Sequence, residues 1–169
     1  MSERCCCPND NPAPICFEED VCGFIITGCK DGCPTMTVFE GAIPEPCPVP
    51  PCPDPIPNST SLIRNKQKWH VAFTWKQDGP TAELMVGTWE VAVYLHRVDA
   101  VSVITKVVTV QHVPRCGHCY TANVEFSPNE VPDGLYEIFG AVGFEVSGNA
   151  YAAISGLAYG PVLKVYTPQ

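Results

Sequence analysis

Large apolar residues occupy every second position over much of the C-terminal two thirds of the chain. The alternation is clearest in residues 68–76, 87–98, 120–127 and 135–146. Its apolar positions are Trp69, Val71, Phe73, Trp75, Trp89, Val91, Val93, Leu95, Tyr120, Ala122, Val124, Phe126, Tyr136, Ile138, Val142 and Phe144. Successive side chains of a strand point to opposite faces of a sheet, so this period predicts strands with one buried face.

Three further segments complete a predicted set of about seven short strands. Residues 102–113 are a β-branched run, and residues 151–160 and 162–167 are separated by Gly160-Pro161, which indicates a bulge or a strand break. No stretch has a helical period. About seven short strands in roughly 100 residues are typical of a β-sandwich, so we expect an all-β fold with one sandwich over residues 58–169.

Two segments of this sandwich carry features of a known superfamily. Residues 89–94, which begin with a tryptophan, look like the Trp-bearing third strand of an immunoglobulin-like domain. Asp133-Gly134-Leu135-Tyr136 looks like the tyrosine corner that opens its sixth strand. Residues 66–167 therefore resemble the immunoglobulin-like superfamily at the level of the fold. Its inter-sheet cysteine pair is absent, with Phe73 and Ile138 at the equivalent positions, and a jelly roll is the alternative sandwich.

Residues 1–57 differ from this body in composition and form a predicted N-terminal arm. Within the arm, two apolar, β-branched segments flank a turn at Asp31-Gly32, which predicts a β-hairpin over about residues 21–43. Eight of the fourteen residues from Pro44 to Pro57 are proline. This composition predicts a polyproline II spacer about 40 Å long, which is enough to carry the hairpin to a neighbouring molecule.

Charge is as unevenly distributed as cysteine and proline. Residues 1–60 contain nine acids and two bases, whereas residues 61–169 contain nine acids and eight bases. The net charge of −8 argues against nucleic acid as a partner, because phosphate binding needs clustered Lys and Arg. No apolar run reaches the roughly 20 residues of a membrane-spanning helix. The cysteine content favours an extracellular or cell-surface location, although no secretory signal is visible at the N-terminus.

Nine of the eleven cysteines lie in the first 60 residues. Cys29 and Cys33 flank the predicted turn, where their side chains come close enough for a disulfide. Cys47 and Cys52 are about 15 Å apart along a polyproline II helix, which is too far for a bond between them. Each of these two is therefore expected to pair elsewhere in the arm, in the body or in another chain.

Cys116-Gly117-His118-Cys119 has the same sequence as the active site of protein disulfide isomerases. That chemistry places the first cysteine at a helix N-terminus, whereas strand alternation starts at Tyr120, so we expect these residues in a turn between strands. A structural disulfide or half of a zinc site is the expected role. We expect no cofactor, and zinc is the alternative, because this pair together with Cys29 and Cys33 would supply four sulfur ligands.

Signatures of catalysis are otherwise absent from the sequence. It contains no G-x-S-x-G elbow, phosphate-binding loop, dinucleotide-binding motif or H-E-x-x-H motif. His70, His96 and His112 fall in predicted strands and are expected on solvated strand faces. We therefore expect a protein that is not an enzyme and has no small-molecule substrate.

These observations favour a structural subunit of a homopolymeric assembly, such as a filament, fibre or shell. The arm would pack on a neighbouring copy or donate a strand to it, reinforced by disulfides, and an odd number of cysteines leaves at least one for an intermolecular bond. The expected interface residues are Val21, Phe24, Ile25, Ile26, Pro44, Pro57, Arg64, Lys66 and Lys68. Two alternatives stay open: a zinc-binding adaptor that uses the arm cysteines, and an adhesion or ligand-binding sandwich on a stalk.

Overall fold

The computed structural model describes residues 11–19, 24–30, 32–43, 60–146 and 150–169. In chain order its strands are β1 (Ala13–Glu19), β2 (Ile25–Thr27), β3 (Thr35–Glu40), β4 (Leu62–Arg64), β5 (Trp69–Asp78), β6 (Gly87–Arg97), β7 (Val103–Gln111), β8 (His118–Phe126), β9 (Gly134–Val146) and β10 (Ala150–Tyr166). Within these described ranges the only helix is a short 3-10 turn, η1 (Pro80–Glu83). The predicted all-β fold is confirmed.

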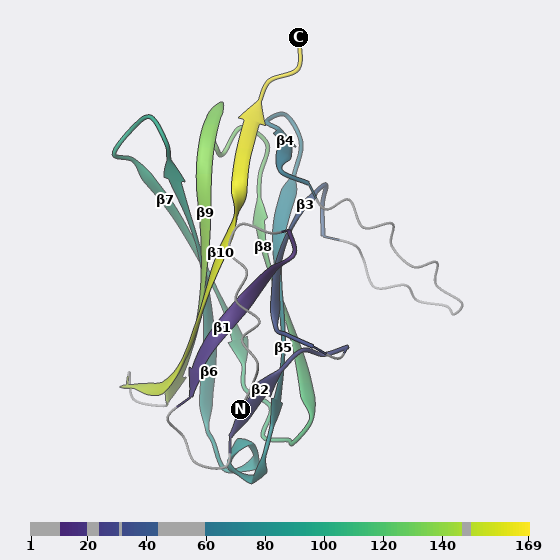
Figure 1. Ribbon diagram of the computed structural model, residues 1–169, viewed down its shortest axis with the longest axis vertical. Coiled ribbons are helices and arrows are strands. Elements are labelled where there is room, and N and C mark those ends of the chain that lie inside the picture. Colours follow the sequence, from purple (N-terminus) through teal and green to yellow (C-terminus); the bar gives the residue numbers. More distant parts are fainter. Residues whose placement is uncertain (1–10, 20–23, 31, 44–59, 147–149) are drawn as a thin grey trace, which may run out of the picture.

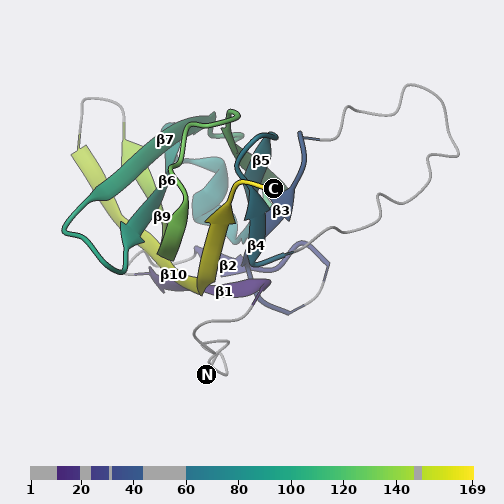
Figure 2. The ribbon, with the colours of Figure 1, turned by 90° about the horizontal axis from the view of Figure 1, so that it is seen from above.

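The strands form one curled sheet whose two halves face each other as in a sandwich (Figures 1 and 2). One half, called sheet A here, contains β8, β5, β2 and β3. The other half, sheet B, contains β10, β9, β6 and β7, with β4 beside the end of β10. β1 joins the halves, because Ala13 and Pro14 pair with β3 while Ile15–Glu19 pairs with β10.

The predicted hairpin over residues 21–43 is wrong. β2 and β3 instead run in the same direction along β5, where Ile25 lies opposite Asp78 and Glu40 lies opposite Trp69. The chain between them forms a loop in which the Gly28 N–H donates to the Gly32 carbonyl oxygen at 3.0 Å. β5 is ten residues long and can therefore accept both short segments as consecutive partners on one edge.

The described part of the predicted arm thus belongs to the sheets of its own chain. Ala13, Ile15, Met36 and Val38 are at most 2% exposed and lie in the core between the two sheets. The spacer from Pro44 to Pro57, and with it Cys47 and Cys52, lies outside the described residues.

Aromatic side chains fill the space between the two sheets. Every apolar position of the four alternating segments is buried, as predicted. Trp89 packs against Trp75, Tyr120 and Phe144, with ring centroids 5.0–5.7 Å apart. The Tyr136 hydroxyl donates to the Pro132 carbonyl oxygen at 2.9 Å and fixes the chain at the start of β9.

β10 continues through Gly160-Pro161 as one strand with a change of register. The pairing with β9 shifts between Tyr159 and Val162, so the predicted irregularity is a bulge. A Cβ on Gly160 would lie 2.6 Å from the Ile138 side chain, which explains the need for glycine there. The bulge keeps alternate side chains of β10 on the outer face of sheet B on both sides of this point.

Candidate functional site

The outward face of sheet B carries three rows of side chains that cross β7, β6, β9 and β10 in turn. The first row is Val107, Ala92, Ala141 and Leu157, the second is Thr105, Tyr94, Phe139 and Tyr159, and the third is Val103, His96, Glu137 and Val162. We call these residues the outer apolar face. Most of them are apolar, although they point away from the core.

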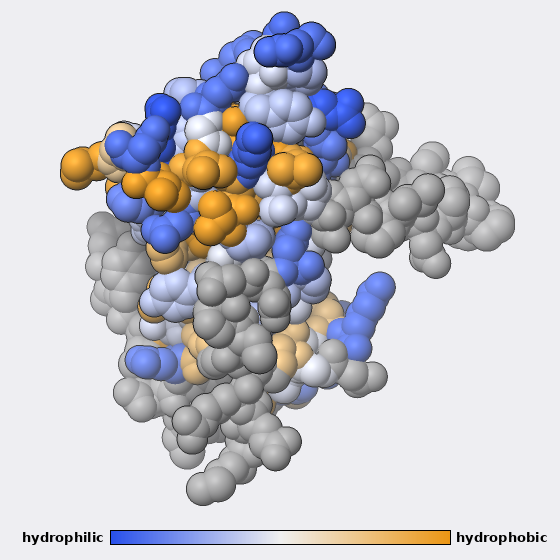
Figure 3. All heavy atoms as spheres, turned by 45° about the horizontal axis from the view of Figure 1, so that its top comes forward, coloured by the Kyte–Doolittle hydropathy of each residue, from blue (hydrophilic) through white to orange (hydrophobic). Residues whose placement is uncertain are grey.

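Several side chains of the outer apolar face are large and strongly exposed. The exposed fraction is 50% for Tyr159, 52% for Leu157 and 47% for Val107. Phe139 and Tyr159 contact each other edge to face, with ring centroids 5.4 Å apart. Figure 3 shows apolar side chains gathered among charged ones toward the upper end of the molecule. A solvated sheet face normally presents polar residues at alternate positions, so this face departs from the usual pattern.

The outward face of sheet A follows the usual pattern. Its two neighbouring rows across β3, β5 and β8 are Thr35, Thr74 and Thr121, and Thr37, Ala72 and Asn123. Thr35 and Thr74 form a hydrogen bond between their hydroxyl groups at 2.9 Å. The contrast between the two faces singles out sheet B as the surface that the sequence keeps apolar.

The free edge of β7 is protected from pairing with another strand. β7 ends the strand order of sheet B and pairs, among the described strands, with β6. Its Lys106 faces the gap between the sheets, where Nζ bonds Glu130 at 2.7 Å and lies 5.0 Å from the centre of the Phe126 ring. An inward-facing charge on an edge strand opposes the addition of a further strand. The outer apolar face, rather than this edge, is the candidate contact surface.

A second candidate site is a group of free cysteines on the outer side of sheet A. Cys29 donates to the Trp75 carbonyl oxygen at 3.2 Å and lies 4.0 Å from the Tyr120 carbonyl oxygen. Its side chain also interacts with that of the neighbouring Cys119. Burial, and next this contact with Cys119, raise the pKa of the Cys29 thiol to about 12. Cys29 is therefore protonated at neutral pH. The neighbouring Cys119 is exposed to solvent.

Cys116 lies in the turn that precedes β8, as the sequence predicts, and is exposed. Its thiol donates to the Asp78 carboxylate at 3.0 Å, and this hydrogen bond raises the pKa of Cys116. Asp78 also forms an ion pair with Lys76 at 3.1 Å. The contacts with Cys116 and then Lys76 lower the pKa of the Asp78 carboxyl. The Lys76 ammonium also interacts electrostatically with both Cys116 and Cys119.

The predicted disulfide between Cys29 and Cys33 is not formed. Cys33 is disulfide-bonded, as is Cys16, whereas Cys29, Cys116 and Cys119 are free. The reason is that β2 and β3 pair one after the other with β5 and not with each other. Cys29 therefore lies against the Trp75 carbonyl oxygen of β5 instead of facing Cys33 across a hairpin. A bonded Cys33 cannot ligate zinc, and the described residues contain no group of three metal-ligating side chains.

The predicted interface residues fall into three groups. Phe24 is buried against Trp89 in its own core, and Ile26 is partly buried, whereas Ile25 is 53% exposed. Val21, Pro44 and Pro57 lie outside the described residues.

The three basic residues expected at the interface, Arg64, Lys66 and Lys68, interact with acids of their own chain. Arg64 pairs with Glu40 at 3.1 Å and Lys68 pairs with Glu125 at 2.9 Å. Lys66 interacts electrostatically with Asp133. A docking acid from another copy would therefore compete with these internal contacts.

Of the three histidines predicted on solvated strand faces, His70 and His112 are buried, which corrects that expectation. His70 is stacked on Phe39 and its Nδ1 lies 2.9 Å from the Gly41 carbonyl oxygen. His112 lies beyond the end of β7 and contacts the Ala82 carbonyl oxygen and the Tyr120 hydroxyl. His96 is on the outer apolar face, 3.3 Å from Glu137. The three rings do not converge on one point.

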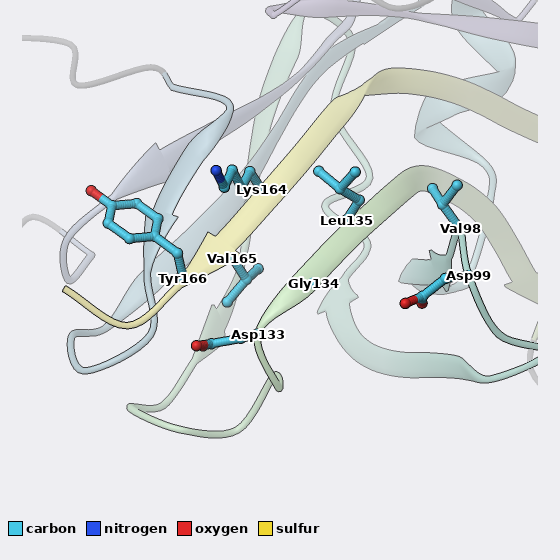
Figure 4. A pocket seen from close by; sticks show the side chains of 8 residues that line it. All are labelled: Val98, Asp99, Asp133, Gly134, Leu135, Lys164, Val165 and Tyr166. Atoms are coloured by element: carbon cyan, nitrogen blue, oxygen red, sulfur yellow. The ribbon is translucent and has the colours of Figure 1, made fainter. Parts of the chain in front are cut away.

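A hollow of about 420 Å³ opens at the end of the sandwich where β9 begins and β10 ends (Figure 4). Its lining residues include Val98, Asp99, Asp133, Leu135, Lys164 and Tyr166. The Asp133 carboxylate accepts hydrogen bonds from Thr167 and Asn65, which lower its pKa, and Asp99 accepts two from Arg97, the shorter at 2.6 Å. Both carboxylates thus have partners in their own chain.

Comparison with known protein families gives no matching family model, and comparison with curated proteins gives no similar sequence. Within the part of the chain that the structure describes, no helix has the length and apolar character to cross a membrane. The argument for function therefore depends on the surfaces described above.

Proposed function

We propose that this protein is a structural subunit that assembles with copies of itself, as in a filament, fibre or shell, through the outer apolar face of sheet B. The observation that carries the proposal is the exposure of Tyr159, Leu157 and Val107 on the outward face of sheet B, whereas the outward face of sheet A presents threonines. Exposed apolar patches of this kind often mark protein–protein contacts. A second copy is the occupant we infer, because an assembly of identical chains needs no other partner.

The size of the outer apolar face sets the expected strength of the contact. Three rows across four strands cover about 400 Å², given a strand spacing of about 4.8 Å and a row spacing of about 6.8 Å. A standard stable interface buries about 800 Å² on each partner. We therefore expect weak, concentration-dependent association through this face alone, with further contacts needed for a stable polymer.

Exposed cysteine supports a covalent contribution to such an assembly. Cys116 is free and exposed in the turn before β8, so it is accessible to a cysteine of another copy. A non-covalent contact on sheet B and a disulfide at this turn would use two different surfaces. Two different surfaces on each subunit allow an open chain of subunits, whereas one self-complementary surface gives a closed dimer.

The donor-strand version of this function needs revision. β2 and β3 already pair with β5 of the same chain, so donation to a neighbour would first require their release. Assembly through a preformed face needs no such step. We propose the face as the contact and keep strand exchange as an outcome that the experiment can reveal.

We also propose that the sandwich is of the immunoglobulin-like kind. Trp89 at the centre of the core supports this assignment, as does the hydrogen bond from Tyr136 to Pro132, which has the form of a tyrosine corner. The assignment rests on these features of the fold and carries no function by itself.

A ligand-binding sandwich is the second candidate function, and the hollow beside Leu135 and Tyr166 is the observation that favours it. End hollows between loops are common ligand sites in sandwiches. Asp99 and Asp133 already accept hydrogen bonds from Arg97 and Asn65. The surface that remains for a ligand is therefore mainly apolar.

Sedimentation velocity over a wide range of protein concentration, together with non-reducing gel electrophoresis, tests the assembly proposal. We expect the weight-average sedimentation coefficient to rise with concentration, and a fraction of disulfide-linked dimer that disappears on reduction. A single monomeric species at every concentration, with a monomeric band on the gel, would refute it.

A further inference from the structure

Cys29 and Cys119 are free cysteines that lie beside the same cross-strand pair of residues. Trp75 of β5 lies opposite Tyr120 of β8, and the Cys29 sulfur lies 3.2 Å from the Trp75 carbonyl oxygen and 4.0 Å from that of Tyr120. Cys119 is the residue next to Tyr120, lies opposite Lys76 and is exposed on the outer side of sheet A. The two side chains are therefore neighbours at the seam between β5 and β8, and they interact electrostatically.

We propose that Cys29 and Cys119 form a reversible disulfide, which cross-links the loop after β2 to β8 when the protein meets a low-molecular-weight disulfide. The bond would join two segments that are 90 residues apart in the sequence and that both flank β5. It would be distinct from the bonds at Cys16 and Cys33, which are already oxidised.

The third free cysteine is held away from this pair. Cys116 donates to Asp78 at 3.0 Å, and Gly117, with φ of 75°, turns the chain between Cys116 and Cys119. A hydrogen bond with a carboxylate also stabilises the thiol form, which raises the pKa of Cys116 and weakens it as a nucleophile at neutral pH. Cys119 is thus better placed to bond with Cys29 than with Cys116.

The chemistry follows two thiol–disulfide exchange steps. In the first, the exposed Cys119 loses its proton and its sulfur attacks one sulfur of the small disulfide R–S–S–R, which forms Cys119–S–S–R and releases R–SH. In the second, Cys29 loses its proton and attacks the Cys119 sulfur, which forms the Cys29–Cys119 bond and releases a second R–SH. The protein loses two protons and two electrons, and the small disulfide is reduced to two thiols.

The environments of the two thiols set the order of the steps. Burial, and next the interaction with Cys119, raise the pKa of Cys29 to about 12, so Cys29 is a thiol at neutral pH. Cys119 is exposed and is therefore the thiol that a disulfide from solution reaches first.

The bond would hold the loop between β2 and β3 at both ends. Cys33 at the far end of the loop is already disulfide-bonded, and the Gly28–Gly32 hydrogen bond closes its base. A link from Cys29 to β8 would add a covalent tie across β5, on the side of sheet A opposite to the outer apolar face in the sandwich. The inference does not depend on self-association.

The test uses the full chain with the bonds at Cys16 and Cys33 intact, treated with oxidised glutathione, alkylated and digested with trypsin. Cleavage after Lys30 cuts the chain between Cys29 and Cys33 and leaves Cys29 on a peptide that also carries the bonded Cys16. Cleavage after Arg115 starts the peptide that carries both Cys116 and Cys119, so the cysteine variants assign the bond. We expect mass spectrometry to find these two peptides joined in the wild type and in Cys116→Ser. The joined species should be absent from Cys29→Ser and Cys119→Ser, and mild reduction should remove it.

Two results would overturn the proposal. One is glutathione retained on Cys119 while Cys29 is alkylated, which would show that the two sulfurs cannot reach bonding geometry. The other is a joined species that persists in Cys119→Ser, which would make Cys116 the partner. All the substituted cysteines lie at exposed or partly buried positions, and a circular dichroism spectrum equal to that of the wild type verifies each variant.

Discussion

Phe139 of β9 and Tyr159 of β10 lie opposite each other on the solvent side of sheet B, and their rings meet edge to face with centroids 5.4 Å apart. Tyr94 of β6 lies on the other side of Phe139 and extends the aromatic row across a third strand. Cross-strand aromatic pairs stabilise a sheet, and on an exposed face they also present a flat apolar surface. This row is the centre of the surface to which we assign self-association.

The tyrosine corner can be tested by removing one oxygen atom. Tyr136→Phe removes the hydroxyl that donates to the Pro132 carbonyl oxygen but keeps the buried ring. We expect a loss of about 1 kcal/mol in the free energy of unfolding, measured by urea denaturation. Tyr159→Phe, which removes an exposed hydroxyl, is the matched control and should change stability by less than about 0.5 kcal/mol. Equal effects of the two substitutions would contradict the assigned role.

Gly140 lies on the inner face of β9 at a point of close contact between the sheets. A Cβ there would lie 2.5 Å from the Met36 sulfur and 2.6 Å from the Phe73 ring. We expect Gly140→Ala to reduce the free energy of unfolding by about 1–3 kcal/mol, because an added methyl group overpacks the core. The same denaturation experiment measures it, and a variant as stable as the wild type would show that β3, which carries Met36, packs less closely on sheet B than described.

We expect the buried His112 to make the free energy of unfolding depend on pH. Burial lowers its pKa below the ordinary value of 6.5, while its contact with Ala82 partly opposes that shift. The unfolded chain therefore binds this proton at a higher pH than the folded chain, so the free energy of unfolding falls as pH decreases from about 6.5 toward the folded pKa.

Urea denaturation between about pH 5 and pH 7 isolates this effect from the carboxyl groups with lowered pKa values, such as Asp78 and Asp133, which act at more acidic pH. We expect His112→Gln to have a smaller slope of stability against pH than the wild type. Parallel slopes would mean that His112 is not the group responsible.

Lys106 is expected to keep the edge of β7 free of other strands. Lys106→Val removes the charge that faces the gap between the sheets and leaves a β-branched run along an unpaired edge. We expect aggregation with a rise in thioflavin T fluorescence, because uncharged edge strands template further strands. Lys106→Arg keeps the charge and should remain as soluble as the wild type. Equal solubility of the valine variant would assign the protection to another feature of this edge.

The sequence predicted the strands of the body and their inward faces because large apolar residues recur there with a strict period of two. It did not predict the partners of β2 and β3. A turn at Asp31-Gly32 between two β-branched segments favours a hairpin locally, but β5 is long enough to take both segments on one edge. Local turn signals cannot reveal a competing partner that lies some 45 residues further along the chain.

The sequence does contain an indication of the outer apolar face, but the strong alternation of the inward residues drew attention away from it. In residues 135–146 the positions between the inward ones include Leu135, Phe139 and Ala141, so both faces of β9 are partly apolar. Their alignment with Tyr94 and Tyr159 depends on the strand order and on the bulge in β10. The residue pattern of a single strand cannot predict these properties of the fold. The proximity of Cys29 to Cys119 likewise depends on the pairing of both β2 and β3 with β5.

The most direct test of the central claim compares two glutamate substitutions by sedimentation velocity at matched concentrations. Tyr159→Glu places a charge in the aromatic row of the outer apolar face, and Thr121→Glu places one at an exposed position on the outward face of sheet A. We predict that Tyr159→Glu sediments as a monomer where the wild type and Thr121→Glu associate. Association of Tyr159→Glu equal to that of the wild type would contradict the account.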